Sequence, residues 1–457
     1  MKKHHSNRSM FSGKLGFVLS AAGASVGLGN IWRFPYLAAK YGGGIFLLIY
    51  ILLALTFGYT MIVAETSLGR MTRKSPVGAF ASFTKSHTLK AGGWINAIIP
   101  ILIVPYYSVI GGWVIKYLFE YICGNGTKLA EDGYFSMFIS DGVSAEICFV
   151  IFALITLTII FAGVRNGIER VSKFMMPILV VLSVIIAIYS VTRPGALKGI
   201  QYFLVPNLEN FSWMTVVSAM GQMFYSLSIA MGILVTFGSY MKKETSIENS
   251  TRNVEVFDTA IAIMAGLMII PAVFAFSGGD PNTLQAGPSL MFITIPKVFA
   301  SMGLGTVVGI LFFVLVLFAA VTSSIALTES AVSTFEDELH WNRKKSTVVI
   351  GIIMLALGTL SSLGYGPLDA VKILGMQFLD FFDFLTNSVM MPIAAIATCL
   401  LVSRVIGVDR IEEEMTQEGG MFRRKKIFVM MIKYLCPVFA AIILISSVMN
   451  AFGLISM

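Results

Sequence analysis

The residues best suited to chemistry in this chain lie inside two strongly apolar segments. Residues 23–30 read GASVGLGN and residues 226–232 read SLSIAMG. Glycine in a helix interior costs about 1 kcal/mol relative to alanine. These stretches therefore indicate either unwound backbone or close packing of helices through small residues. Unwound backbone would leave carbonyl groups free for a cation and amide groups free for an anion.

Oxygen-bearing side chains accompany these segments. The set comprises Asn30, Ser226, Ser228, Asp258, Thr322, Ser323 and Ser324. Hard cations prefer hydroxyl, amide, carboxylate and carbonyl oxygens as ligands. A single Ser or Thr in a membrane helix usually bonds back to its own helix, but the whole set favours a cation site.

Ionisable residues also occur in or beside apolar runs, where they usually mark function. They are Arg33, Glu65, Asp258, Asp380 and Asp383. Each could instead lie at an interface or pair structurally, and for Glu65 we predict a buried structural pairing.

The composition predicts that these residues are held by membrane-spanning helices. Only 13% of the 457 residues are charged, against about 25% in soluble proteins, and the mean hydropathy is +0.82. A spanning helix needs about 20 mostly apolar residues. Apolar runs cover residues 15–31, 45–63, 95–114, 147–164, 174–191, 213–240, 259–277, 298–328, 346–363, 384–403 and 435–457. Because helices satisfy their own backbone in lipid, we expect an all-α integral membrane protein with about eleven spans.

The net charge of +8 comes from short basic clusters between apolar runs, at residues 70–74, 242–243, 343–345 and 423–426. This pattern suits membrane topology and not nucleic-acid binding. By the positive-inside rule, the amino terminus is cytoplasmic, and eleven spans place the carboxyl terminus outside. The four cysteines form no CxxC pattern, so we interpret them as packing residues.

The interrupted segments fall in the first and sixth spans, with five helices in each block. Paired breaks at matching places indicate an inverted repeat with a binding site at the membrane midplane. The resulting division is 1–14 as an amino-terminal segment, 15–191 and 212–403 as the two repeats, 192–211 and 404–426 as an outer and a cytoplasmic loop, and 427–457 as the eleventh helix.

Four motifs resemble the neurotransmitter:sodium symporter family, in particular its bacterial amino-acid-transporting branch with eleven helices. They are GASVGLGNIWRFPYLAAKYGGGIFLLIY (23–50), GQMFYSLSIAMG (221–232), AAVTSSIALTES (319–330) and QFLDFFDF (377–384). The resemblance covers nearly the whole chain. It implies uptake of a neutral amino acid together with sodium by alternating access, in a plasma membrane such as a bacterial inner membrane.

The resemblance also implies two sodium sites. One would use Ser25, Asn30, Ser226, Asp258 and the substrate carboxylate, and the other Gly23, Val26, Ala319, Thr322 and Ser323. The substrate would contact Ser25, Leu28, Gly29, Ile103, Tyr107, Ile110, Phe224, Tyr225, Ser226, Ser228, Met231, Ser323, Ser324 and Leu327.

Two gates are implied as well. Arg33 and Asp383 would close the outer path as an ion pair, above an aromatic lid of Tyr107 and Tyr225. Arg8 and Asp337 would close the inner path, with Tyr240 and Phe11 nearby.

Departures from the family pattern narrow the substrate. Gly27 stands where amine-carrying relatives place an aspartate, which argues for an amino acid. Asp258 stands where many relatives have asparagine, and Ala262 where chloride-dependent ones have serine. A fixed carboxylate would replace the charge of chloride, so we predict chloride independence; proton counter-transport through Asp258 stays open. Met231 is flexible, so we expect a hydrophobic or aromatic amino acid.

Three alternatives use the same features differently. A proton-driven or exchanging amino-acid carrier would not need Asn30 with the Thr322–Ser323 pair. A ligand-sensing receptor would not need two gates. A membrane enzyme would need a nucleophile–base pair or a metal cluster, and neither is visible in the sequence, so we expect no enzyme.

Overall fold

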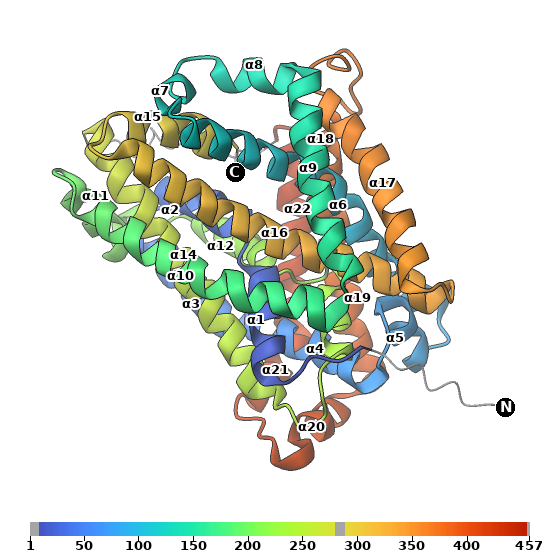
Figure 1. Cartoon of the computed structure of the whole chain (residues 1–457). Coiled ribbons are helices and arrows are strands. Elements are labelled where there is room, and N and C mark those ends of the chain that lie inside the picture. The colour runs from blue at the N-terminus through green and yellow to red at the C-terminus, as the bar shows by residue number, and fades with distance from the viewer. Residues whose placement is uncertain (1–8, 279–287, 455–457) are drawn as a thin grey trace.

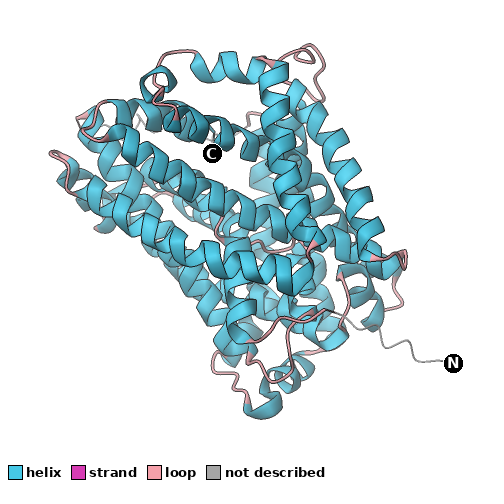
Figure 2. Cartoon of the chain, viewed as in Figure 1, coloured by secondary structure: helices cyan, strands magenta, loops and turns pink. Residues whose placement is uncertain are grey.

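The computed structural model describes residues 9–278 and 288–454. Helices form all of the regular structure in these ranges, and no strand occurs there (Figure 2). The described part contains nine helices that are long and apolar enough to cross a membrane. They are α3–η2–α4 (Gly44–Thr72), α6 (His87–Ile122), α9 (Gly142–Phe161), η3–α10 (Val164–Val191), α14 (Ile247–Ser277), α16 (Gly305–Glu338), α17 (Arg343–Leu363), α18–η7–α19–η8 (Phe378–Ile406) and α21–η10–α22 (Lys425–Ala451).

Both interruptions expected from the small residues are present. Helix α1 (Lys14–Ser25) is followed, after a break, by η1 (Gly29–Arg33) and α2 (Phe34–Lys40), and the two parts are bent by 54°. Helices α12 (Trp213–Ser226) and α13 (Ile233–Ser239) flank irregular residues 227–232. The first span therefore continues beyond the predicted end at residue 31, because a half-buried charge such as Arg33 interrupts an apolar run without ending a helix.

Shorter helices cap the two ends of the bundle. Helices α7 (Gly126–Leu129) and α8 (Tyr134–Ser140) lie at the upper end, and α20 (Val408–Thr416) lies at the lower end (Figure 1). The predicted outer loop 192–211 contains α11 (Ala196–Leu204), and the predicted loop 404–426 contains α20.

The broken first helix lies inside the bundle. Ten of the twelve residues of α1 are buried, and α1 packs against α10, α14 and α16. The other broken helix is held by α4 (Tyr59–Thr72), which runs along α13. The two breaks are thus surrounded by protein, which is the condition for irregular backbone at membrane depth.

The contact between α4 and α13 depends on glycine. A Cβ atom added to Gly69 would lie 1.9 Å from the carbonyl oxygen of Val235, and one added to Gly238 would lie 2.4 Å from that of Thr66. The two backbones therefore touch, and neither glycine can carry a side chain without separating the helices.

We expect Gly69→Ala to destabilise the protein. Alanine gains about 1 kcal/mol of helix propensity, but a clash with backbone costs typically about 1–3 kcal/mol or more in a packed interior. Thermal unfolding of the purified protein in detergent should show a lower midpoint. Gly221→Ala is the control, because nothing lies within 4 Å of its added Cβ. A Gly69→Ala midpoint equal to that of Gly221→Ala would contradict the packing argument.

Candidate functional site

The two broken segments bond directly to each other. The Ser228 hydroxyl donates to the carbonyl oxygen of Ala24 at 3.0 Å, and Gln222 Nε2 donates to that of Gly29 at 3.0 Å. These bonds satisfy carbonyl groups that unwinding would otherwise leave unpaired in the protein interior.

The break between α12 and α13 includes two non-glycine residues in the left-handed region, Ser228 with φ 53° and Ala230 with φ 59°. Such backbone persists only where its surroundings hold it. The amide of Ala230 donates to Glu65 Oε1 at 2.8 Å, and Glu65 is fully buried. The predicted structural pairing of Glu65 is confirmed, and its partner is a backbone amide instead of a charged side chain.

A buried carboxylate lies beside the breaks. Asp258 Oδ1 accepts from Asn30 Nδ2 at 2.8 Å and from the Ser226 hydroxyl at 2.8 Å. Asp258 Oδ2 accepts from the hydroxyl of Tyr50 at 3.0 Å. Sequence reasoning missed Tyr50; a tyrosine within an apolar run was the available signal.

Nothing in direct contact balances the charge of this carboxylate. Asp258 has no exposed surface, and its hydrogen-bond partners are neutral. Within the described ranges no Lys or Arg forms an ion pair with it. Burial of an unpaired charge is strongly unfavourable. The carboxylate and hydroxyl oxygens gathered here fit a hard cation, and Asn30 faces them with its amide nitrogen while its Oδ1 accepts from the amide of Gly27 at 3.2 Å.

The structure brings part of the second predicted ligand group together. The Ser323 hydroxyl donates to the carbonyl oxygens of Gly23 at 3.2 Å and Val26 at 3.4 Å. The Thr322 hydroxyl donates to the carbonyl oxygen of Ala319 at 3.1 Å. A Cβ added to Gly23 would lie 3.1 Å from Thr322 Cβ, so the helices approach closely at this point. The Ser323 hydroxyl thus lies among carbonyl oxygens at the end of α1, whereas the Thr322 hydroxyl bonds back to the carbonyls of Phe318 and Ala319 on its own helix.

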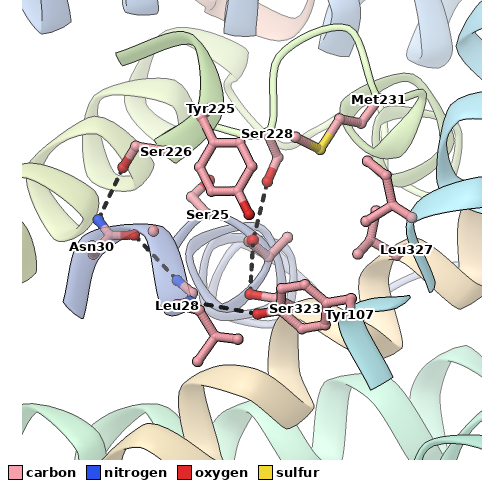
Figure 3. A pocket seen from close by; sticks show the side chains of 14 residues that line it. Ser25, Leu28, Asn30, Tyr107, Tyr225, Ser226, Ser228, Met231, Ser323 and Leu327 are labelled. Carbon is pink, nitrogen blue, oxygen red and sulfur yellow. Dashed lines mark hydrogen bonds between the residues drawn. The ribbon is translucent and has the colours of Figure 1, made fainter. Parts of the chain in front are cut away.

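A pocket of about 30 Å³ lies between these two oxygen clusters (Figure 3). Its polar side contains Asn30 and Ser226, and its apolar side contains Met231 and Leu327, which face them across the pocket. The remaining lining residues are Ala24, Ser25, Gly27, Leu28, Gly29, Ile103, Tyr107, Tyr225, Ser228 and Ser323. A water molecule needs a cavity of at least about 10–15 Å³. The pocket therefore has room for little more than water, and a larger ligand requires lining side chains to move.

One end of the pocket is suited to an anion. The amide of Leu28 points to the Tyr107 hydroxyl at 3.5 Å, at the start of η1. Free amides at a helix amino terminus favour negative charge. A Cβ added to Gly27 would lie 2.7 Å from Ser323 Oγ, so this position admits no carboxylate side chain without displacement.

Three predicted substrate contacts lie elsewhere. The Ser324 hydroxyl turns away from the pocket and bonds to Thr156 at 3.0 Å, because its helical position faces α9. Ile110 and Phe224 line a separate outer cavity of about 330 Å³. Tyr225 lines both cavities and therefore forms the partition between them.

The outer charged pair is present but not in direct contact. Arg33 and Asp383 both line the outer cavity. The Arg33 guanidinium lies 5.1 Å from the centre of the Tyr225 ring, and Asp383 accepts from Asn387 Nδ2 at 2.6 Å. The predicted closing pair therefore stays a prediction, since in this conformation Arg33 lies over Tyr225 and Asp383 bonds to Asn387 one turn along its own chain segment.

Of the residues predicted for the inner gate, Arg8 lies outside the described residues. Asp337 accepts from the amide of Ser75 at 2.6 Å. The Tyr240 hydroxyl donates to Glu329 at 2.7 Å, and the buried Glu329 forms an ion pair at 2.6 Å with the partly exposed Arg343. Sequence reasoning missed this last pair, although Glu329 directly follows an apolar run.

Comparison with known proteins agrees with these features. The family model described as the sodium:neurotransmitter symporter family matches residues 8–127 and 136–454. An uncharacterized sodium-dependent transporter of Bacillus subtilis, YhdH, is 34% identical over 89% of this chain and 90% of its own. The human sodium- and chloride-dependent GABA transporter 2 is 26% identical over 90% of this chain and 75% of its own.

A solved structure shows the same fold. The crystal structure of MhsT in complex with L-phenylalanine superimposes with a TM-score of 0.86 at 34% identity, covering 96% of this chain and all of that one. Both the family match and the fold match thus extend over nearly the whole chain, and the family consists of transporters and not enzymes. The chain belongs to the sodium:neurotransmitter symporter family.

Proposed function

We propose that this protein carries a neutral, hydrophobic or aromatic L-amino acid into the cell together with sodium ions. The observation that carries the proposal is the buried Asp258 carboxylate, which has neutral hydrogen-bond partners and lies next to the pocket. A cation bound there would offset its charge. An amino-acid carboxylate at the Leu28 end would then add a second negative charge close to the bound cation.

The lining of the pocket supports the substrate class. Ile103, Met231 and Leu327 provide apolar surface, and Gly27 leaves no carboxylate to receive a substrate amine. A relative of this chain, MhsT, is known in complex with L-phenylalanine. We therefore propose an amino acid with an apolar side chain, for which Met231 can change conformation.

Two sodium ions fit the two oxygen clusters, one at Asp258 and one at Ser323. Each cluster joins a broken helix to another helix, since Asn30 meets α14 and the carbonyl of Gly23 meets α16. Ion binding would therefore favour the conformation in which both partners are in place. We propose that Arg33 with Asp383, and Asp337 with Tyr240, control access from the two sides during alternating access.

The orientation in the membrane is also a proposal. We place the amino terminus in the cytoplasm and the carboxyl terminus outside, with α12 and α13 forming one broken span and the two five-helix repeats at 15–191 and 212–403. The basic clusters at 70–74 and 423–426 support this orientation. We also propose that the protein lies in the plasma membrane of a bacterium.

We expect uptake of a labelled hydrophobic amino acid into proteoliposomes to require an inward sodium gradient. A panel of labelled amino acids, tested with sodium and with potassium, measures this and identifies the substrate. Equal uptake in both salts would favour the alternative, a proton-coupled or exchanging carrier of related fold.

We expect uptake to be unchanged when chloride is replaced by gluconate. The physical reason is that Asp258 supplies a fixed negative charge at the sodium site, and Ala262, one turn further along α14, offers no hydroxyl to an anion. Initial rates in the two anions, at equal sodium concentration, provide the measurement. Loss of uptake in gluconate would show that chloride completes the site.

We expect Ser323→Ala to raise the sodium concentration for half-maximal uptake by about tenfold, because one lost oxygen ligand is worth about 1–1.5 kcal/mol. Ser324→Ala is the matched control, since its hydroxyl contacts Thr156 instead of the α1 carbonyls. Uptake measured over a range of sodium concentrations tests both variants. Equal sodium curves for the two would contradict the second site.

A further inference from the structure

Arg424 connects a cytoplasmic segment to the helices of the Asp258 site. It directly precedes α21, and its guanidinium Nη1 lies 3.1 Å from both carboxylate oxygens of Glu255. The same nitrogen donates to the carbonyl oxygen of Leu55 at 3.3 Å, and the guanidinium carbon lies 4.6 Å from the centre of the Tyr59 ring. One side chain thus bridges α14 and the η2–α4 helix.

These are the two helices that hold the carboxylate at the sodium site. Glu255 precedes Asp258 by three residues on α14, which is one helical turn or about 4.5 Å along the axis. On the partner helix, Tyr50 donates to Asp258, and Tyr59 donates to Glu248. The helices are antiparallel, and Arg424 joins them between these two hydrogen bonds.

The backbone at this level is suited to adjustment. Leu55 belongs to η2 (Ala54–Gly58), a π-helical segment between Tyr50 and Tyr59. Such segments loosen the regular hydrogen bonding of a helix and often occur at functional sites. Arg424 therefore contacts this helix at its π-helical segment.

We propose that Arg424 is a positioning residue for the Asp258 sodium site, acting through Glu255 and the π-helical segment. The inference rests on the proposed function, since it presumes sodium at Asp258. Removal of the guanidinium would let α14 and the η2–α4 helix separate, so that Tyr50, Ser226 and Asn30 no longer surround Asp258 in the binding geometry.

Arg424 is the main direct charge partner of Glu255. Glu255 is 3% exposed, and Arg424 is the cation within ion-pair distance of it. Glu248 and Arg252, on the same helix, also lie close enough to influence its charge. Loss of Arg424 would leave two buried carboxylates near each other, with the more distant Arg252 as compensation.

The next residue provides a matched control. Arg423 carries the same charge one position earlier. Its side chain is exposed and lines a cavity of about 100 Å³ that Arg424 does not line. Arg423→Gln and Arg424→Gln remove the same long-range charge. A difference between them therefore reports the contacts of Arg424.

The test measures sodium binding without a substrate. Purified wild-type protein in detergent is heated at increasing NaCl, with KCl keeping ionic strength constant, and the rise in unfolding midpoint gives the half-saturating sodium concentration. We expect Arg424→Gln and Glu255→Gln each to raise this concentration about threefold to tenfold, and the double variant to raise it no further. Arg423→Gln should match the wild type.

The midpoint in KCl separates stability from sodium binding. Arg424→Lys is the milder variant should Arg424→Gln not fold, because lysine keeps the charge but lacks the planar group, and we expect an intermediate shift. A lower midpoint in KCl with an unchanged half-saturating sodium concentration would overturn the inference. Wild-type protein that sodium does not stabilise relative to potassium would overturn the proposed sodium site itself.

Discussion

A carboxylate held away from water without a cation in contact is strongly unfavourable, and Asp258 is placed in this situation by three different segments. Asn30 comes from the broken first helix, Tyr50 from α3 (Gly44–Leu53) and Ser226 from the end of α12. Their dipoles stabilise the charge but do not neutralise it. A cation bound there, as we propose, would do so only while these segments remain together, which would couple ion binding to the arrangement of the helices.

The proposed site requires unwound backbone. Unwound backbone inside a membrane protein requires hydrogen-bond partners for its amide and carbonyl groups. Protein side chains supply these partners at both breaks. Ser228 and Gln222 bond to carbonyls of the first helix, and Glu65 bonds to the amide of Ala230. The glycine contact of Gly69 with Val235 brings α4 close enough for Glu65 to reach the break.

The sequence allowed prediction of the helical fold and of both breaks, since apolar length and clustered glycine are local signals. It did not predict how side chains orient within a helix. Ser323 and Ser324 are adjacent and chemically identical, but one meets α1 and the other meets α9. Partners distant in sequence were also missed, among them Tyr50 with Asp258 and Glu329 with Arg343. The outer ion pair depends on the conformation of the transporter, which a sequence does not specify.

The two ends of the pocket differ in how strongly they are closed. Toward the outer cavity of about 330 Å³, the partition is the ring of Tyr225, a single side chain that can rotate. Toward Tyr240, the Glu329–Arg343 pair and the hydrogen bond of Tyr240 to Glu329 join α16, α17 and the end of α13. Glu329 is buried and Arg343 is 20% exposed, so separating this pair would leave a buried carboxylate without its cation, whereas rotation of one ring breaks no ion pair. The described conformation is therefore closer to opening on the Tyr225 side. Opening on the other side would require a source of free energy, which binding of ions and substrate at the two breaks would supply if the proposed sites are correct.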